Sequence, residues 1–241
     1  MPRYRRNQTP NLIRHVMSRG NGRMCIFLDD GDYRQFVNLL SDVVEHFGIR
    51  CWNYCLMPNH YHATWQPTLP NFSEAVRELN GNYGQWWNRK HGRVGHVFQG
   101  RFKDQIVDRD TYLLTLSRYV VMNPVRGGLV KVPDDWMWSS YRATVGLCST
   151  PSFLAVDATL SLFGEGEESL LRARFIDAVN RQWDPAADDR IRSKQRILGT
   201  KAFKDLILGR QLVAPGAACV ADAPVLEPLR QTDVDEAKII V

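Results

Sequence analysis

The sequence has no apolar run that approaches the roughly 18 residues needed for a membrane-spanning helix. Its first ten residues, MPRYRRNQTP, lack the apolar stretch of a signal peptide. Both absences predict a soluble, cytoplasmic protein that makes no contact with a membrane.

Cysteine is scarce, and its spacing carries no metal or disulfide signature. The chain has five cysteines, an odd number, and none of them forms a C-x2-C pair. This excludes a disulfide framework and a zinc knuckle. Cys51 and Cys55 are the closest pair, and because they lie in an apolar, strand-like run we expect buried thiols there rather than metal ligands.

Glycine and proline are also too few for a fibrous or disordered chain, with 17 and 12 among 241 residues. The chain is 44% hydrophobic and 24% charged, which is typical of globular proteins. The length suits one large domain or two small ones.

Positive charge is concentrated in the first part of the chain. Residues 1–150 contain 19 Lys and Arg against 12 Asp and Glu, a net charge of +7, whereas residues 151–241 contain 12 against 14, a net charge of −2. A basic region rich in Trp and Tyr suits a nucleic acid, because phosphates supply affinity and aromatic faces hold unpaired bases.

Hydrophobic periodicity predicts a β-α-β-β-α-β-α order, and its first six elements match a ferredoxin-like split β-α-β fold. We therefore expect an α+β protein with an antiparallel sheet and helices packed on one face. The predicted strands are 11–19, 49–56, 60–65 and 102–107, and the predicted helices are 32–47, 71–90 and 110–122.

Changes in composition and hydrophobic periodicity divide the chain into three parts. We expect a catalytic domain over residues 1–148, a helical extension over 149–212 with helices near 168–182 and 187–208, and a flexible tail over 213–241. Trp136 and Trp138 lie in an aromatic lobe at the end of the first domain, where we expect at least one indole to serve packing.

The strongest local motif is His60-Tyr61-His62 within a predicted strand. Side chains at positions i and i+2 of a strand point to the same face, so the two imidazoles project together and can share one metal ion. Taken alone, the pattern is more typical of two polar residues on a solvated strand face.

A partner for the histidines is offered by Tyr119 and Asn123, which share one face of the last predicted core helix. If that face looks toward the sheet, the amide oxygen completes a His-His-Asn metal site beside a phenol. The other interpretation is a half-buried aromatic residue followed by a helix cap in front of Pro124.

In combination these motifs resemble the HUH single-tyrosine transposases, and more closely the REP-associated tyrosine transposases. The strings LMPNHYH, GHVFQGRFK, YVVMNPVRGGLV and DDWMWSSY occur in that family's order. The resemblance covers roughly residues 10–145, and a weaker likeness lies in ILGTKAF near 197–203.

The resemblance implies a metal-dependent endonuclease and strand transferase that acts on single-stranded DNA carrying palindromic, REP-like hairpins. Carried over by position, His60 and His62 match the HUH pair, Tyr119 matches the nucleophile, and Asn123 matches the polar third ligand. Some insertion-sequence relatives have Gln at this third-ligand position. Asn is shorter by one methylene, and we expect this difference to affect which metal ion is preferred.

Elementary chemistry is consistent with these roles. An attacking phenolate approaches an anionic phosphodiester, and a divalent cation offsets the repulsion. The expected product is a 5′-phosphotyrosine with a free 3′-OH, which a second 3′-OH can resolve without ATP. Two imidazoles and an amide are neutral ligands that suit Mg²⁺ or Mn²⁺, although Zn²⁺ also accepts two histidines.

Other residues compete for these roles. Tyr112, one heptad before Tyr119, is the serious rival nucleophile. The four histidines that have no partner at ligand spacing are expected in surface or loop positions; they are His15, His46, His91 and His96.

Candidate DNA-binding residues form two groups. An N-terminal basic arm precedes the first strand, and a second group surrounds the glycine-containing segment 91–101 beside two indoles. The arm contains Arg3, Arg5 and Arg6, and the second group contains Trp86, Arg89, Lys90, Arg93, Arg101 and Lys103.

Two other functions remain open from the sequence. One is a non-catalytic protein that binds DNA hairpins, and the other is a different HUH nuclease, such as a replication initiator or relaxase. A monomer and a homodimer are both compatible with the sequence.

Overall fold

The structure is a computed structural model that describes residues 6–181, 185–193 and 195–212. Arg3, Arg5 and the predicted tail 213–241 lie outside the described residues. None of the described helices is long and apolar enough to cross a membrane.

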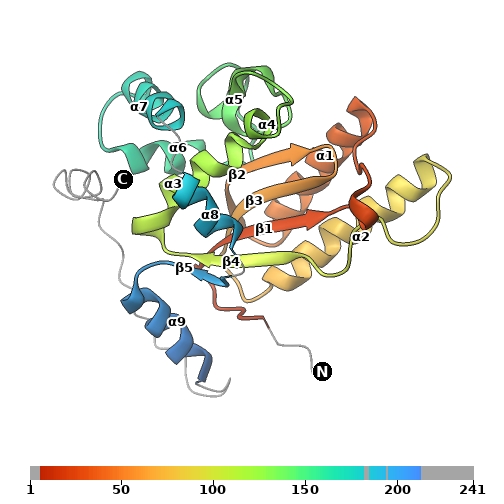
Figure 1. Cartoon of the computed structure of the whole chain (residues 1–241), viewed down its shortest axis with the longest axis horizontal. Helices are drawn as coiled ribbons and strands as arrows, with labels where there is room; N and C mark the ends of the chain where they lie inside the picture. The colour runs from red at the N-terminus through yellow and green to blue at the C-terminus, as the bar shows by residue number, and fades with distance from the viewer. Residues whose placement is uncertain (1–5, 182–184, 194, 213–241) are drawn as a thin grey trace.

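A five-stranded sheet in the order β2-β3-β1-β4-β5 forms the centre of the molecule (Figure 1). The first four strands are antiparallel to their neighbours, as expected for a ferredoxin-like fold, and β5 adds a short parallel pairing with β4. The strands are β1 (Ile13–Arg19), β2 (Ile49–Met57), β3 (His60–Pro67), β4 (Lys103–Val107) and β5 (Ile197–Leu198).

Two long helices, α1 (Asp30–His46) and α2 (Phe72–Lys90), cover one face of the sheet (Figure 1). Asp29 caps the first of them by accepting a hydrogen bond from the backbone NH of Asp32. Tyr61 of β3 points into this layer, packs against Phe36 and donates to the Asn80 side chain at 2.9 Å. The largest apolar core of the protein therefore lies between this face and the two helices.

The opposite face of the sheet is covered by α3 (Arg109–Val121), which is capped by Asp108. Leu113, Leu116 and Val120 of this helix pack against Trp52 and Cys55 of β2 in a second apolar cluster. The sheet is thus buried on both sides. This differs from the predicted single helical layer, because a short link after β4 lets α3 fold back over the sheet.

The remaining elements pack around this core. Between β1 and α1 lies the short helix η1 (Asn21–Arg23). After α3 the chain forms α4 (Asn123–Arg126), η2 (Pro133–Asp135) and α5 (Tyr141–Thr144). The C-terminal part contains α6 (Val156–Leu160), η3 (Ser161–Phe163), α7 (Glu168–Asn180), α8 (Pro185–Arg192) and α9 (Lys201–Leu212). Trp138 stacks on Tyr33 with ring centroids 4.7 Å apart, and the Trp136 indole donates to the Leu56 carbonyl at 3.0 Å. Both indoles of the aromatic lobe therefore serve packing.

The prediction of one helix over 187–208 was wrong. The chain leaves α8, forms β5 beside β4, and begins α9 after Thr200, whose hydroxyl accepts from the NH of Phe203 at 3.2 Å. Gly199 explains the break, because an added Cβ would lie 2.5 Å from the Phe203 ring and 2.8 Å from Asp108. This close approach of two chain segments needs glycine.

Candidate active site

The predicted histidine pair lies on the α3 face of the sheet. His60 and His62 are both in β3, and their ring centroids are 5.0 Å apart. Tyr61, between them, points to the opposite face. The alternation of the strand therefore places both imidazoles beside α3 and separates them from the α1–α2 layer.

His60 is held in one orientation by its neighbour. Its Nδ1 lies 2.6 Å from Oδ1 of Asn59, and the Asn59 amide nitrogen donates to the Arg23 carbonyl at 3.1 Å. Since the amide oxygen can only accept, Nδ1 of His60 carries the proton, and Nε2 keeps its lone pair. Burial, with a smaller effect from Arg19, lowers the pKa of His60 to about 4.

His62 is 5% exposed and contacts a third histidine, His15 of β1. The two rings are stacked with centroids 5.0 Å apart, and Nδ1 of His62 lies 2.8 Å from Nε2 of His15. Burial is the main reason that the pKa of His62 lies well below its usual value, and it lowers the pKa of His15 to about 4. All three imidazoles are therefore neutral near pH 7.

Tyr119 lies directly beside these rings. Its aromatic ring meets His62 edge-on with centroids 5.7 Å apart, and it meets His15 in the same way at 5.9 Å. The side chain is 6% exposed, and its hydroxyl makes no hydrogen bond with any described residue. α3 thus places the phenol ring of Tyr119 against His62 and His15.

Arg126 covers the Tyr119 ring from α4. Its guanidinium carbon lies 4.0 Å from the ring centroid, and Nη2 donates to the Tyr119 carbonyl. The same guanidinium pairs at 2.6 Å with Asp188 of α8, and both side chains are 3% exposed. A buried ion pair from the C-terminal part therefore fixes the cation over the tyrosine.

Asn123 lies at the start of α4, and only Met122 separates it from the end of α3. Its amide nitrogen donates to the carbonyls of Tyr119 at 2.9 Å and Val120 at 3.2 Å. The side chain thus caps α3, as the alternative interpretation predicted. Its amide oxygen accepts no hydrogen bond from the described residues, so capping leaves that oxygen available as a ligand.

These groups fit a divalent cation by their chemistry. The described residues contain no cluster of three or more His, Cys, Asp or Glu side chains that could hold a metal ion. His60 and His62 offer neutral imidazoles. The third donor would be the amide oxygen of Asn123, which occupies the position of the polar third ligand in the family resemblance. His15 is not available as a ligand, because hydrogen bonds occupy both of its ring nitrogens.

The other candidates of the sequence lie elsewhere. Tyr112, the rival nucleophile, is partly buried against the second apolar cluster and makes no ring contact with either histidine among the described residues. Cys51 and Cys55 are buried free thiols, as predicted. His46 and His96 are exposed.

The prediction that His15 lies at the surface or in a loop was wrong. The residue is fully buried in the central strand, because α3 covers the face of the sheet that it occupies. The sequence alone does not indicate this role. It follows from the antiparallel pairing of β1 with β3, which sets Met17, two residues after His15, opposite His62. Arg126 was missed for the same reason, since its partner Asp188 lies far along the chain.

Arg6 is the described member of the predicted basic arm. Its guanidinium pairs with Asp104 at 2.8 Å and lies 3.7 Å from the centroid of Phe102. Arg14 shares the same carboxylate at 2.9 Å. Two positive charges against one negative charge leave this end of β4 basic.

The second basic group surrounds the segment between α2 and β4. Arg89, Arg101 and Lys103 are exposed and make no ion pair with a described residue, and Arg93 lies 5.7 Å from the centroid of Trp87. Trp86 is half-buried against the main core. The tip of this segment carries Val94, which is 97% exposed.

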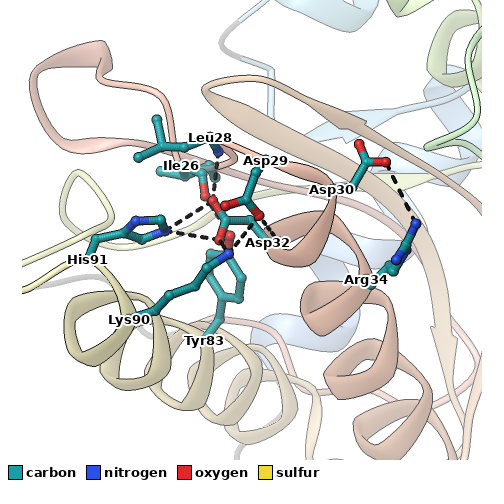
Figure 2. Close-up of polar contacts among 9 residues, drawn as sticks. All are labelled: Ile26, Leu28, Asp29, Asp30, Asp32, Arg34, Tyr83, Lys90 and His91. Atoms are coloured by element: carbon teal, nitrogen blue, oxygen red, sulfur yellow. Dashed lines mark hydrogen bonds and ion pairs between the residues drawn. The ribbon is translucent and has the colours of Figure 1, made fainter.

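Lys90 differs from its neighbours because two carboxylates hold it (Figure 2). Its ammonium lies 2.6 Å from Asp29 and 2.7 Å from the fully buried carboxylate of Asp32, which His91 also contacts at 3.0 Å. Hydrogen bonding to Lys90 lowers the pKa of Asp29. The end of α2 is thereby fastened to the start of α1, where the exposed segment begins.

The fold and the site together define a class of protein: a ferredoxin-like domain with a strand-borne histidine pair facing a tyrosine on the last helix of the domain. The family described as "Transposase IS200 like" matches residues 8–123. This part of the chain belongs to that family and is distantly related to the REP-associated tyrosine transposases.

Two curated relatives have this relationship. A Haemophilus influenzae protein assigned to the REP-associated tyrosine transposases is 27% identical over 128 residues, which are 47% of this chain and 72% of the relative. The REP-associated tyrosine transposase of Escherichia coli is 28% identical over 123 residues, 49% of this chain and 69% of the relative. Both matches leave about half of the present chain unaccounted for.

A solved structure is similar in fold. A REP-associated tyrosine transposase bound to a REP hairpin superposes with a TM-score of 0.53 at 21% identity and covers 64% of this chain and 92% of its own. The likeness confirms the α+β architecture that the sequence predicted.

Proposed function

We propose that this protein is a metal-dependent endonuclease and strand transferase that cleaves and rejoins single-stranded DNA at palindromic, REP-like hairpins. The observation that carries the proposal is the edge-on contact between the Tyr119 ring and His62, with His60 alongside. A phenol that contacts one imidazole of a neutral histidine pair supports phosphodiester transfer through tyrosine.

In the proposed reaction the Tyr119 oxygen attacks the phosphorus of the scissile phosphodiester. The bond between that oxygen and phosphorus forms, the bond from phosphorus to the 3′ oxygen breaks, and the 3′ oxygen leaves as a hydroxyl after taking a proton from water. Tyr119 loses its own proton to solvent. One phosphoester replaces another of similar energy, so a different 3′-OH can run the step in reverse and join new strands.

His60 and His62 would hold the cation through their Nε2 atoms, and the Asn123 oxygen would complete the protein ligands. When bound, Mg²⁺ or Mn²⁺ supplies positive charge at the phosphate oxygens and so stabilises the transition state. The neutrality of both histidines supports this role, because only the unprotonated nitrogen is a ligand.

The DNA itself would be held by the basic groups around the site. Arg93 and Arg101 lie in the segment that joins α2 to β4, and Arg89 and Lys103 lie at its two ends. In the sheet, β4 is separated by β1 alone from β3, which carries His60 and His62. Uncompensated cations at the surface suit phosphates, and this supports a single strand that leaves a hairpin stem beside Tyr119.

Covalent trapping tests the proposal. The full-length protein is incubated with Mn²⁺ and end-labelled oligonucleotides that carry palindromic stems with randomised single-stranded flanks, and the products are resolved on a denaturing gel. We expect a protein–DNA adduct with the wild type, loss of the adduct with Tyr119→Phe, and retention with the matched variant Tyr112→Phe.

Each other outcome has a defined meaning. An adduct that persists in Tyr119→Phe but vanishes in Tyr112→Phe assigns the nucleophile to Tyr112. Hairpin binding without any adduct in the wild type would reduce the protein to a non-catalytic DNA binder. Cleavage that survives the double change His60→Ala, His62→Ala rules out the metal assignment.

A further inference from the structure

A chain of side-chain hydrogen bonds runs from the C-terminal part of the protein to His62. The Gln105 amide nitrogen of β4 donates to the backbone carbonyls of Ser193 at 3.3 Å and Gln195 at 2.9 Å. Its amide oxygen lies 3.1 Å from Nδ1 of His15. Nε2 of His15 in turn lies 2.8 Å from Nδ1 of His62.

The two carbonyls settle the direction of every bond in this chain. Carbonyl oxygens only accept, so the nitrogen of the Gln105 amide faces them and its oxygen faces His15. An amide oxygen also only accepts, so Nδ1 of His15 carries a proton. His15 is fully buried, and burial disfavours a charged ring, so a ring that carries its proton on Nδ1 leaves Nε2 of His15 bare.

The bare nitrogen of His15 fixes the state of His62. Two nitrogens 2.8 Å apart share one proton, so Nδ1 of His62 donates to Nε2 of His15. In neutral His62 the remaining nitrogen, Nε2, is then unprotonated. It makes no hydrogen bond with any described residue and is free to bind a cation.

We infer that His15 and Gln105 are positioning residues that hold His62 in the tautomer that binds metal, and that the backbone carbonyls of Ser193 and Gln195 set this arrangement from outside the family domain. The inference extends the proposed function by naming what prepares one of its metal ligands. Ser193 and Gln195 lie beyond residues 8–123, the range that the family model matches.

The neighbouring ligand is prepared in a parallel way, which supports the inference. Nδ1 of His60 donates to the Asn59 oxygen, and the Asn59 amide is turned by the Arg23 carbonyl. Each histidine of the pair thus donates from Nδ1 to a group whose orientation a backbone carbonyl determines. Such outer partners fix the ring and its tautomer in protein metal sites.

Histidine-selective ¹⁵N NMR tests the inference on full-length protein free of metal and DNA. Two-bond ¹H–¹⁵N correlations at pH 7 report which ring nitrogen carries the proton, and a His62→Gln sample assigns the His62 signals. We expect His62 to be protonated at Nδ1 and bare at Nε2. Protonation at Nε2 in the wild type overturns the inference.

Variants then test whether His15 determines the tautomer of His62. His15→Phe keeps a ring but removes the acceptor, so we expect His62 to populate the other tautomer and Mn²⁺ affinity to fall by about 10–100-fold. His15→Gln retains an acceptor oxygen in reach and is expected to stay closer to the wild type. His46→Phe, at an exposed histidine, is the matched control and should change neither readout.

A second variant guards against loss of folding. If circular dichroism shows that His15→Phe is unfolded, Gln105→Met removes the first acceptor and leaves His15 in place, with the same expected direction. Unchanged tautomer and unchanged Mn²⁺ affinity in a folded variant overturn the inference. The NMR result needs no cleavage, so an inactive protein with the expected tautomer defeats the proposed function alone.

Discussion

The guanidinium of Arg126 lies over the ring of Tyr119, with its central carbon 4.0 Å from the ring centroid. The same cation forms a buried ion pair with Asp188 of α8. One side chain therefore connects the candidate nucleophile to a helix that lies outside the family domain.

Loss of Asp188 should destabilise the protein strongly. Asp188→Asn removes the carboxylate of a buried ion pair with Arg126, and we expect the free energy of unfolding to fall by about 3–5 kcal/mol. Urea denaturation measures the change. Asp177→Asn removes an exposed pair with Arg181 and should cost only about 0–1 kcal/mol. Equal effects of the two variants would contradict the structural role of the buried pair.

Asn123 should contribute both to stability and to metal binding. Asn123→Ala removes two hydrogen bonds to the end of α3 and the free amide oxygen, so we expect a loss of about 1–2 kcal/mol in unfolding free energy and weaker Mn²⁺ binding. Electron paramagnetic resonance of free Mn²⁺ follows the second effect. Asn123→Gln keeps the amide group on a longer side chain, so it distinguishes the effect of side-chain length from the effect of losing the amide. Wild-type affinity in Asn123→Ala would remove Asn123 from the ligand set.

Stability should fall as the pH drops below about 6.5, the ordinary histidine pKa. Burial lowers the pKa of His15 to about 4, so between these values the unfolded chain binds a proton that the folded chain does not. The free energy of unfolding then falls with decreasing pH, by at most about 1.4 kcal/mol per pH unit for this residue.

A comparison of variants distinguishes the contribution of His15 to the pH dependence from that of the Asp and Glu side chains. Urea unfolding of the wild type and His15→Phe between pH 7 and 5 should give a shallower slope for the variant, whereas the exposed His46→Phe should match the wild type. Parallel slopes for all three proteins would mean that His15 is not held neutral.

Arg89 and Lys90 are adjacent in sequence but should differ in their contribution to DNA binding. Arg89 has no ion-pair partner among the described residues, whereas Asp29 and Asp32 hold Lys90 (Figure 2). For hairpin binding, Arg89→Gln should reduce the slope of log affinity against log salt by about 1. Lys90→Gln should change the slope less and should lower the melting temperature. Equal slopes would argue against contact at Arg89.

The sequence predicted the elements from β1 to α3 almost residue for residue, and the reason is physical. Amphipathic periods, capping residues such as Asp29 and turn residues such as Pro58 act locally and leave local patterns. The shared face of His60 and His62 follows from strand alternation alone. These features needed no knowledge of which strands become neighbours.

The missed features depend on contacts distant in sequence. His15 reaches His62 through the pairing of β1 with β3, and Gln105 reaches Ser193 only after the C-terminal part has folded back. β5 spans two residues, which is too short for any period to show. Both faces of β1 are buried, so polar residues of this strand do not alternate with buried ones, and the position of His15 could not be inferred from such a pattern.

Tyr61 separates the two candidate ligands along β3 and is anchored in the α1–α2 layer by Asn80. Substitutions in that layer therefore reach the histidines only through displacement of the strand backbone. Substitutions there should act chiefly by lowering the melting temperature, whereas substitutions at His60, His62 or Tyr119 change the candidate site itself at every temperature.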